Sequence, residues 1–389
     1  MYKCTIIGIS DSHQLWFKPE ILNIIKQGKV FSGGKRHHEL VKKILPQGAE
    51  WIDVTVPLKN VFNQYEQYDD IVVFASGDPL FYGLATTLKR EFPNVIMSIY
   101  PTFNSLQTLA HKLCLPYHNM RTISLTGRPW DRFDEALICG EELIGCLTDK
   151  QKNPQTIMQR MLYYGFDNYT MYVGENLGNE EKEHVGTYVA GKEYDCPNCL
   201  ILKRTRRIDK RFGIPDAEFN LLDGRIKMIT KMPVRLATIA ALCLNDKESL
   251  WDVGFCTGSV SIESKLSNPH LNVTAFEIRP EGKNLMDMNS RKFHVPGINA
   301  IIGDFVTLDI SNIPQPDAVF IGGYGGKMSE IIHKVHAKLK PGGCIVFNSV
   351  SQQSRDQFIS LTTELGMNTI IYHTITVDEN NPITILKAE

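Results

Sequence analysis

The sequence has no long apolar run and no excess of charge of either sign. It contains no stretch of about eighteen consecutive apolar residues, so we expect no transmembrane helix. Its 42 basic and 43 acidic residues leave a net charge of −1, which argues against a nucleic-acid or membrane partner held by a polybasic surface. With 43% hydrophobic and 22% charged residues, the 389-residue chain has the composition of an ordered globular protein and not of a disordered or collagen-like one.

We expect neither a secretion signal nor a disulfide framework. The apolar stretch of MYKCTIIGIS leads into a turn and not into a small-residue cleavage site. Nine scattered cysteines, an odd number, favour free thiols in a reducing cytoplasm. Cys196 and Cys199 form a Cys-x-x-Cys motif, but no second motif or histidine pair has matching spacing. We therefore favour the start of a strand over a zinc or redox site and expect no metal.

Short apolar segments alternate with helical patterns in the first half of the chain. The length allows about two to four domains. The patterns predict helices over 19–28, 105–113 and 154–165. They predict strands over 2–9, 71–75, 95–100, 122–126, 144–147 and 169–175, followed by a terminal hairpin of HVGTYVAG and CLILKR. Such alternation predicts the α/β class, with a mostly parallel sheet covered on both faces.

The pattern breaks at residues 203–213, where KRTRRIDKRFG is charged and non-periodic. We therefore predict two domains, 1–205 and 206–389. The break is either a solvated linker or a basic run that attracts a polyanionic substrate. Beyond it, the patterns predict strands over 248–254, 273–278, 298–305, 317–323 and 343–350, helices over 259–267, 280–293, 326–339 and 352–365, and a closing hairpin of TIIYHTITV and PITILKAE. This order is typical of a Rossmann-like sheet with an antiparallel edge.

A glycine-containing turn, DVGFCTG, follows the first strand of the second half and runs from Asp252 to Gly258. It departs from the dinucleotide pattern G-x-G-x-x-G, because Cys256 takes the place of the second glycine. The spacing instead suits a nucleoside that carries a carboxylate and an amino group, as S-adenosylmethionine does. Glu277 ends the next strand, where an acidic side chain can accept hydrogen bonds from ribose hydroxyls. Asp304 ends the third strand, either as an adenine contact or as the N-cap of the next segment.

The fourth strand of this half ends in FIGGYGG, residues 320–326. It lacks the Asp/Asn-Pro-Pro-aromatic turn of enzymes that methylate exocyclic nitrogens, which argues against a nucleic-acid amino-methylase. We expect Gly322 and Gly323 to leave room for a large, flat substrate. The alternative is a flexible loop, although ordering four glycines costs conformational entropy.

Polar residues also follow two predicted strands of the first half. In ASGDPLFYG, Gly77, Asp78 and Pro79 shape a turn, and in PTFNSLQ, Thr102 and Ser105 offer hydroxyl groups. Ligands of open α/β sheets collect at the carboxyl edge of the strands. These residues therefore predict a polar pocket, with a helix cap as the alternative for Asp78.

Two basic segments accompany this pocket. Lys35 and Arg36 lie in SGGKRHH, and Arg128 lies in TGRPW. Arginine is well shaped to bind carboxylates, so we expect these residues to bind substrate. The alternative is ordinary surface charge.

Together these motifs resemble a known family. ASGDPLFYG, PTFNSLQ and SLTGRP are similar to the tetrapyrrole methylases of cobalamin synthesis. GIPDAEF, ITKMPVR, DVGFCTGSVSIE and FIGGYGG are similar to their decarboxylating partner methylases. The ordered pair covers nearly the whole chain and resembles the fused precorrin-6Y C5,15-methyltransferases (decarboxylating).

The resemblance implies two S-adenosylmethionine sites on two folds. An N-terminal tetrapyrrole-methylase fold, with two αβα subdomains and the cofactor between them, would precede a Rossmann-like methyltransferase domain. The implied contacts of the first site are Gly77, Asp78, Pro79, Thr102 and Ser105. Those of the second site are Thr230, Gly254, Phe255, Cys256, Thr257, Gly258, Glu277 and Asp304. We also expect a homo-oligomer.

The implied reaction belongs to the synthesis of the corrin ring. Precorrin-6Y would be methylated at C5 by the first half and at C15 by the second half, which would also remove the C12 acetate carboxyl as carbon dioxide and give precorrin-8X. No catalytic acid–base dyad stands out in the sequence.

Two departures and two rival functions remain. Ser10, Asp11 and Ser12 stand where the family has a G-x-G-P-G turn, and Phe255 and Cys256 stand where it has Cys-Gly. The loop with Ser10, Asp11 and Ser12 would face the substrate. The side chains of Phe255 and Cys256 must either point away from the cofactor or reshape its pocket. The rivals are a nicotinamide-dependent oxidoreductase and a non-catalytic corrinoid-binding protein.

Overall fold

The computed structural model describes residues 3–225, 228–379 and 381–389 and divides them into two compact units. The first unit extends to Arg128 and includes Glu142–Met158 and Tyr169–Thr205. The second consists of Pro129–Glu141, Gln159–Asn168 and Arg206–Glu389. The chain passes for the last time from one unit to the other at the predicted boundary, but two earlier segments also belong to the second unit. The contiguous division into 1–205 and 206–389 stays a prediction.

The first sheet is parallel throughout, with the strand order β3-β2-β4-β1-β5. Its strands are β1 (Lys3–Ile9), β2 (Val30–Gly33), β3 (Glu50–Asp53), β4 (Asp70–Ser76) and β5 (Ile96–Tyr100). Ile6 and Val73 pack into one apolar cluster and Ile7 and Phe74 into another, because neighbouring residues of a strand point to opposite faces. The predicted sheet with two covered faces is confirmed here, while Tyr2, at the start of the first predicted strand, lies outside the described residues.

Helices fill the connections of this sheet. They are α1 (Pro19–Gln27), α2 (Lys35–Val41), α3 (Leu58–Tyr65) and α4 (Leu84–Glu91). Helix α5 (Ser105–Lys112) follows β5 and packs against the second sheet. The predicted first helix and the helix after residue 105 are confirmed. Helix α4 does not follow the ASGDP turn directly but begins at Leu84, because residues 80–83 form a turn and a bend.

The second sheet has the order β6-β7-β10-β8-β9 and is mixed. Its strands are β6 (Arg121–Ser124), β7 (Leu143–Leu147), β8 (Tyr169–Glu175), β9 (His184–Thr187) and β10 (Asn198–Arg204), and helices α6 (Asp131–Cys139) and α7 (Pro154–Tyr163) lie between them in sequence. The predicted hairpin of HVGTYVAG and CLILKR is wrong. β10 pairs with β7 and β8, and β9 pairs with β8. Residues 199–202 are buried, so the apolar CLILKR segment takes a central position and the half-exposed β9 lies at the edge.

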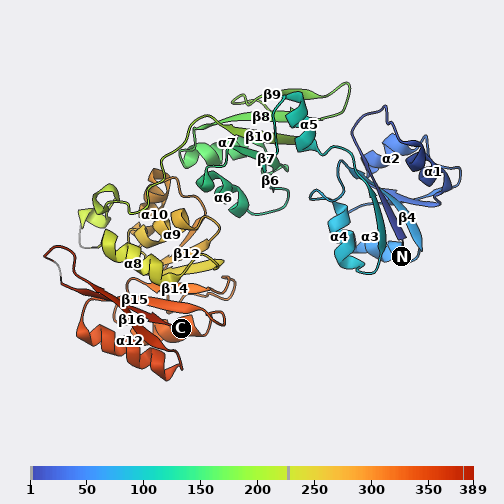
Figure 1. Cartoon of the computed structure of the whole chain (residues 1–389). Coiled ribbons are helices and arrows are strands. Elements are labelled where there is room, and N and C mark those ends of the chain that lie inside the picture. The colour runs from blue at the N-terminus through green and yellow to red at the C-terminus, as the bar shows by residue number, and fades with distance from the viewer. Residues whose placement is uncertain (1–2, 226–227, 380) are drawn as a thin grey trace. The chain divides into compact units, whose positions relative to one another are not determined.

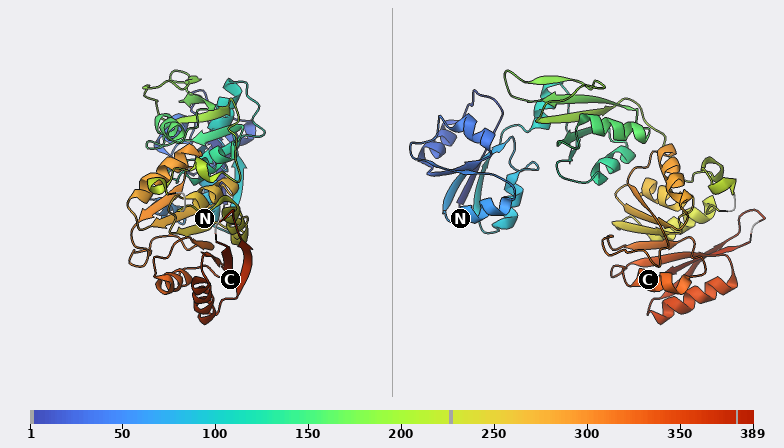
Figure 2. Two further views of the ribbon diagram at one scale, coloured as in Figure 1. Left: turned by 90° about the vertical axis from the view of Figure 1, so that its left-hand side faces the viewer. Right: turned by 180° about the vertical axis from the view of Figure 1, so that it is seen from behind.

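The third sheet confirms the Rossmann-like prediction, with the order β13-β12-β11-β14-β15-β17-β16. Its parallel strands are β11 (Ser249–Val253), β12 (Asn272–Glu277), β13 (Ile298–Ile302), β14 (Ala318–Ile321) and β15 (Cys344–Ser349). The predicted closing hairpin is also confirmed. Strands β16 (Thr369–Ile375) and β17 (Ile383–Ala388) add the antiparallel edge, drawn in red in Figure 1 and Figure 2.

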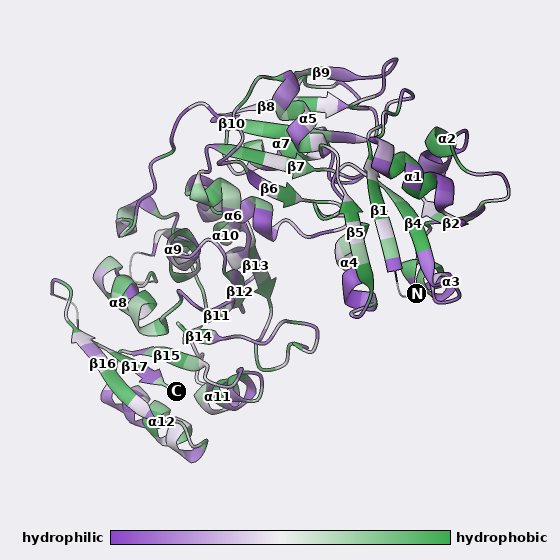
Figure 3. Ribbon diagram, turned by 45° about the vertical axis from the view of Figure 1, so that its right-hand side comes forward, coloured by the Kyte–Doolittle hydropathy of each residue, from purple (hydrophilic) through white to green (hydrophobic). Residues whose placement is uncertain are grey.

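Helices cover both faces of this third sheet. They are α8 (Met232–Leu242), α9 (Ser259–Ser267), α10 (Glu281–Lys292), α11 (Met328–His336) and α12 (Gln352–Glu364), with short 3₁₀ turns at Asp216–Glu218 and Leu222–Gly224. Trp251 and Val253 pack with α11 and α12, whereas Leu250 packs on the other face with α8 and α9. Buried strands such as β4 are largely apolar (green in Figure 3), whereas the edge strand β9 is not.

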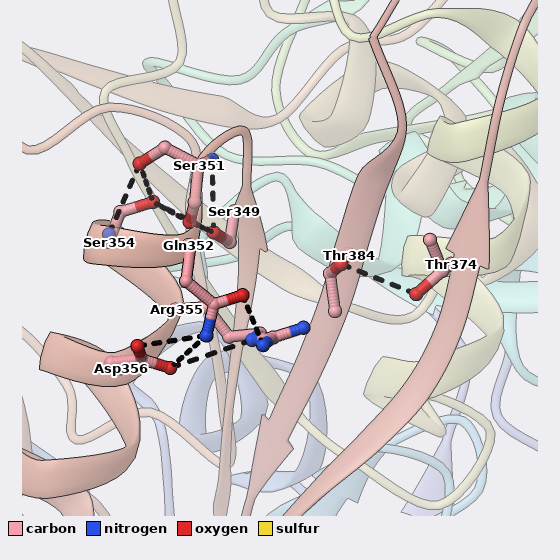
Figure 4. Close-up of polar contacts among 8 residues, drawn as sticks. All are labelled: Ser349, Ser351, Gln352, Ser354, Arg355, Asp356, Thr374 and Thr384. Carbon is pink, nitrogen blue, oxygen red and sulfur yellow. Dashed lines mark hydrogen bonds and ion pairs between the residues drawn. The ribbon is translucent and has the colours of Figure 1, made fainter.

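A serine cap fixes the start of α12. The Ser351 side chain accepts a hydrogen bond from the backbone N–H of Ser354 (Figure 4).

In the described part of the chain, no helix has both the length and the apolarity needed to span a membrane.

Candidate functional sites

A pocket of about 440 Å³ lies at the carboxyl ends of the third sheet's strands, within the usual size range for ligand sites. The turn after β11, the end of β12, and the loops after β13 and β14 all contribute to it. The structure brings together nine of the predicted residues here: Thr230, Gly254, Phe255, Cys256, Thr257, Glu277, Asp304, Gly322 and Gly323. Gly258 is not among the residues that line the pocket and is the N-cap of α9.

The turn after β11 is narrow because it touches the loop after β14. Gly254 has a φ of +79°, and a Cβ atom there would lie 2.7 Å from the backbone N and O of Gly323. Glycine is therefore required at Gly254. Phe255 buries its ring in the apolar cluster that contains Ile262 and Met286, so it extends the core beside the pocket.

Cys256 adopts the left-handed conformation, with a φ of +51°, which non-glycine residues rarely take. Burial, followed by the nearby Glu277 carboxylate, raises the pKa of the Cys256 thiol to about 11. The side chain therefore stays a thiol at neutral pH, which does not favour a nucleophile or a metal ligand.

The carboxylate of Glu277 is held against this turn. One oxygen accepts a hydrogen bond from the backbone N–H of Cys256 at 2.9 Å. The other accepts from the backbone N–H and the guanidinium of Arg279 at 3.1 and 3.0 Å. The side chain is only 2% exposed, and a Cβ atom at Gly282 would lie 2.7 Å from the Cγ atom of Glu277. Glu277 is thus fixed at the pocket wall.

Asp304 lines the same pocket and also makes the local contact that the capping alternative predicts. One carboxylate oxygen accepts from the backbone N–H of Val306 at 3.0 Å. The other pairs with the Lys327 ammonium at 2.6 Å. Its hydrogen bond to Lys327 lowers the pKa of Asp304, so the carboxylate is charged at neutral pH.

Asp252 lies in β11, two residues before Gly254 of the turn, and is fully buried. It accepts a hydrogen bond from the Ser261 hydroxyl at 2.6 Å, and its other oxygen has no partner among the described residues. Burial, with a smaller contribution from Glu277, raises the pKa of Asp252 to about 7. The sequence located this residue but predicted no role for it.

A buried ionic network missed by sequence analysis anchors Thr230 beside the pocket. The fully buried Arg235 pairs with the fully buried Glu263 and donates to the backbone carbonyl of Thr230 at 2.6 Å. The second oxygen of Glu263 accepts from the backbone N–H groups of Gly213 and Ile214, both at 2.7 Å. The signal was an arginine inside MPVRLATIAAL, an otherwise apolar helix.

A second pocket, of about 450 Å³, lies in the first unit at the ends of β1 and β4. Four predicted residues line it: Arg36, Gly77, Asp78 and Ser105. The predicted residues Lys35, Pro79, Thr102 and Arg128 are not among its lining residues. Thr102 still shapes this pocket through its backbone N–H, which donates to the carbonyl of Gly77 at 3.2 Å.

Close backbone contacts form the floor of this pocket. Gly77 has a φ of +63°, and a Cβ atom there would lie 2.9 Å from the Cα atom of Asn104. A Cβ atom at Gly8 would lie 1.9 Å from the carbonyl oxygen of Gly77. Asp78 accepts from the backbone N–H of Leu80 at 2.9 Å, within the turn that precedes α4. The helix-cap alternative for Asp78 is wrong, because α4 begins at Leu84 and its N-cap is Gly83.

The basic residues predicted to bind carboxylates are partly engaged within the protein. Arg36 forms an ion pair with Asp11 at 3.2 Å and donates to the Ser76 hydroxyl oxygen at 2.8 Å. Arg128 lies over the ring of Tyr82, 5.0 Å from its centroid. The departure at Ser10, Asp11 and Ser12 therefore supplies Arg36 with its counter-ion, and Ser10 and Asp11 both line the pocket.

The Cys-x-x-Cys segment begins a strand, as favoured from the sequence. Cys196 is exposed and Cys199 is buried in β10. Within the described ranges, no group of three or more His, Cys, Asp or Glu side chains is placed to hold a metal ion.

Two folds, each with a pocket at its sheet edge, define a two-module enzyme class, and comparison with known proteins identifies both modules. Residues 3–191 match the tetrapyrrole (corrin/porphyrin) methylases, and residues 222–387 match the precorrin methyltransferase domain. The chain is 30% identical to a precorrin-6Y C(5,15)-methyltransferase (decarboxylating) of a Sinorhizobium species, over 93% of this chain and 88% of that protein. The chain belongs to the precorrin-6Y C5,15-methyltransferase (decarboxylating) family.

Two shorter proteins of Salmonella typhimurium are also similar to parts of the chain. A cobalt-precorrin-6B C(15)-methyltransferase (decarboxylating) is 34% identical over 37% of this chain and 74% of its own length. A cobalt-precorrin-7 C(5)-methyltransferase is 27% identical over 46% of this chain and 87% of its own length.

Proposed function

We propose that this chain converts precorrin-6Y to precorrin-8X in cobalamin biosynthesis, with two molecules of S-adenosylmethionine as methyl donors. The first half methylates C5. The second half methylates C15 and removes the C12 acetate carboxyl as carbon dioxide. The observation that carries the proposal is a separate pocket at the carboxyl edge of a parallel sheet in each unit, in a chain of this family.

Both pockets have features that fit a nucleoside cofactor. In the second pocket, Gly254 lets the backbone approach the ligand, and Glu277 and Asp304 offer acceptors to the ribose and the adenine. Thr230, Phe255, Cys256 and Thr257 complete its wall. In the first pocket, the backbone at Gly77 and the polar groups of Asp78 and Ser105 play the matching part. When bound, S-adenosylmethionine supplies an electrophilic methyl group.

The first pocket also suits a flat, apolar ring. Phe103 is 60% exposed and Tyr82 is 42% exposed, and both line the pocket. Aromatic side chains stack favourably on conjugated rings. The two side chains can therefore contact a face of the macrocycle, while Arg36 lies near the pocket's polar side.

The second half needs positioning more than a strong base. Breaking the bond between the C12 acetate methylene and its carboxyl group releases carbon dioxide and leaves an electron pair. The conjugated ring would carry that pair to C15, and bound S-adenosylmethionine would supply the methyl group that C15 takes up. The residues of the second pocket would hold the two partners in position. Gly322 and Gly323 leave space where ring and cofactor meet.

Turnover with isotope-labelled S-adenosylmethionine tests the proposal. Mass spectrometry should show two added methyl groups and the loss of carbon dioxide, with either metal-free or cobalt-containing precorrin. Bound ring without methyl transfer would favour the corrinoid-binding alternative, and saturable binding of NADH in a fluorescence titration would favour the oxidoreductase. The expected homo-oligomer stays a prediction, which light scattering tests.

A further inference from the structure

In the first pocket, the hydroxyl oxygen of Ser76 faces two hydrogen-bond donors. Ser76 ends β4, is exposed, and lines the pocket. Arg36 donates to its oxygen from Nη2 at 2.8 Å, and the Nε2 atom of His37 lies 2.9 Å from the same oxygen.

The tautomer of His37 follows from its other nitrogen. The backbone N–H of Gly34 donates to Nδ1 of His37 at 3.1 Å, so Nδ1 carries a lone pair. Burial, and then the charge of Arg36, lower the pKa of His37 to about 4, and the ring is neutral at pH 7. A neutral imidazole has one proton, which must therefore be on Nε2.

The proton of the Ser76 hydroxyl must then point elsewhere. A hydroxyl has one hydrogen to donate and two lone pairs to accept with. Neither a guanidinium N–H nor the protonated Nε2 can accept a hydrogen bond. The two carboxylates that line this pocket make other contacts, since Asp11 pairs with Arg36 and Asp78 accepts from Leu80.

We infer that Ser76 contacts the ligand of the first pocket and donates its hydroxyl hydrogen to a carboxylate. A cationic donor on the hydroxyl oxygen polarises the O–H bond and makes it a stronger donor, which suits a charged acceptor. This inference rests on the proposed function, in which both ligands carry such a group. One source is the methionine end of S-adenosylmethionine, and the other is a carboxylate side chain of the tetrapyrrole.

The test compares Ser76→Ala with Ser76→Thr in the full chain. Both are assayed for C5 methylation by mass spectrometry, with each of the two ligands varied in turn. Ser76→Ala should raise the KM of one ligand by about tenfold to a hundredfold, because a hydrogen bond to a charged group is lost. Ser76→Thr keeps the hydroxyl and should restore that KM to near the wild-type value. A change confined to S-adenosylmethionine assigns the carboxylate to the cofactor, and a change confined to the tetrapyrrole assigns it to the substrate.

Release of carbon dioxide by the same variants is the internal control, because that reaction belongs to the other pocket. It should keep its wild-type rate, as should that of Ser360→Ala, a variant of an exposed serine in the second unit. If Ser76→Ala leaves both KM values unchanged while the wild type methylates C5, the role of Ser76 is refuted. If the wild type itself does not methylate C5, the proposed function is refuted instead.

Discussion

Replacement of Glu277 by alanine tests how the second pocket holds its cofactor. The variant loses a charged acceptor for ribose, which costs about 1.5–3 kcal/mol of binding free energy. It also leaves the backbone N–H of Cys256 without its 2.9 Å partner and frees the guanidinium of Arg279. The turn that shapes the pocket is then less rigid, which adds to the loss. We expect the affinity of the second pocket for S-adenosylmethionine to fall about tenfold to a hundredfold.

Because each pocket is proposed to carry out its own reaction, the KM of S-adenosylmethionine can be measured for each pocket separately. The KM of S-adenosylmethionine is measured once from the release of carbon dioxide coupled to C15 methylation, and once from C5 methylation. Glu277→Ala should raise only the first value. Glu277→Gln keeps an oxygen that can accept from Cys256 but loses the charge, so its effect should be smaller. An unchanged first value, or an equal rise in both, would show that Glu277 is not the ribose ligand.

Three further outcomes are expected. Fragments 1–205 and 206–389, expressed together, should copurify on a tag carried by either one, because hydrogen bonds join the end of α7 to α10 and to the residues after it; separate elution would contradict this. Gly323→Val should give a product methylated at C5 that keeps its C12 carboxyl, as seen by mass spectrometry. Gly323→Ala should be milder, since the nearest atoms to a new Cβ lie 3.9 Å away. The buried Asp252 should make the protein less stable as pH rises from its ordinary pKa of 3.8 to about 7, because only the unfolded state ionises in that window. The loss is at most about 4 kcal/mol, and urea unfolding of Asp252→Asn should not show it.

The sequence predicted the long, apolar strands of the sheets and missed the short, mostly exposed β3. β4 and β11 were found because apolar runs persist where both faces of a sheet are covered. β3 has only four residues, EWID, of which just one is buried, and such a segment does not differ from a loop by pattern. The position of β10 between β7 and β8 depends on pairing with strands that are more than twenty residues away in sequence. The hydrophobic periodicity of a segment gives no information about such long-range pairing.

The candidate sites show the same division between local and non-local information. Glycine turns and acidic strand ends are local features, so Gly254, Glu277 and Asp304 of the second pocket could be named in advance. The Asp11–Arg36–Ser76 contacts join a loop, the start of helix α2 and the end of strand β4, which lie far apart in sequence. For that reason the sequence predicted a carboxylate-binding role for Arg36 but not its ion pair with Asp11.

Cys256 shows how a departure from a motif can keep the motif's geometry. The sequence suggested that a side chain in place of glycine must turn away from the cofactor or reshape the pocket. The backbone there keeps a left-handed φ of +51°, the conformation that glycine favours. Gly254 could not be replaced in the same way, because its Cβ would collide with the backbone of Gly323. A left-handed angle alone costs a side chain about 1–2 kcal/mol, which a stable domain tolerates. A Cβ atom at position 254 would instead overlap the backbone of Gly323, which a side chain cannot avoid by adopting a left-handed angle. The fold of this turn therefore requires glycine at Gly254.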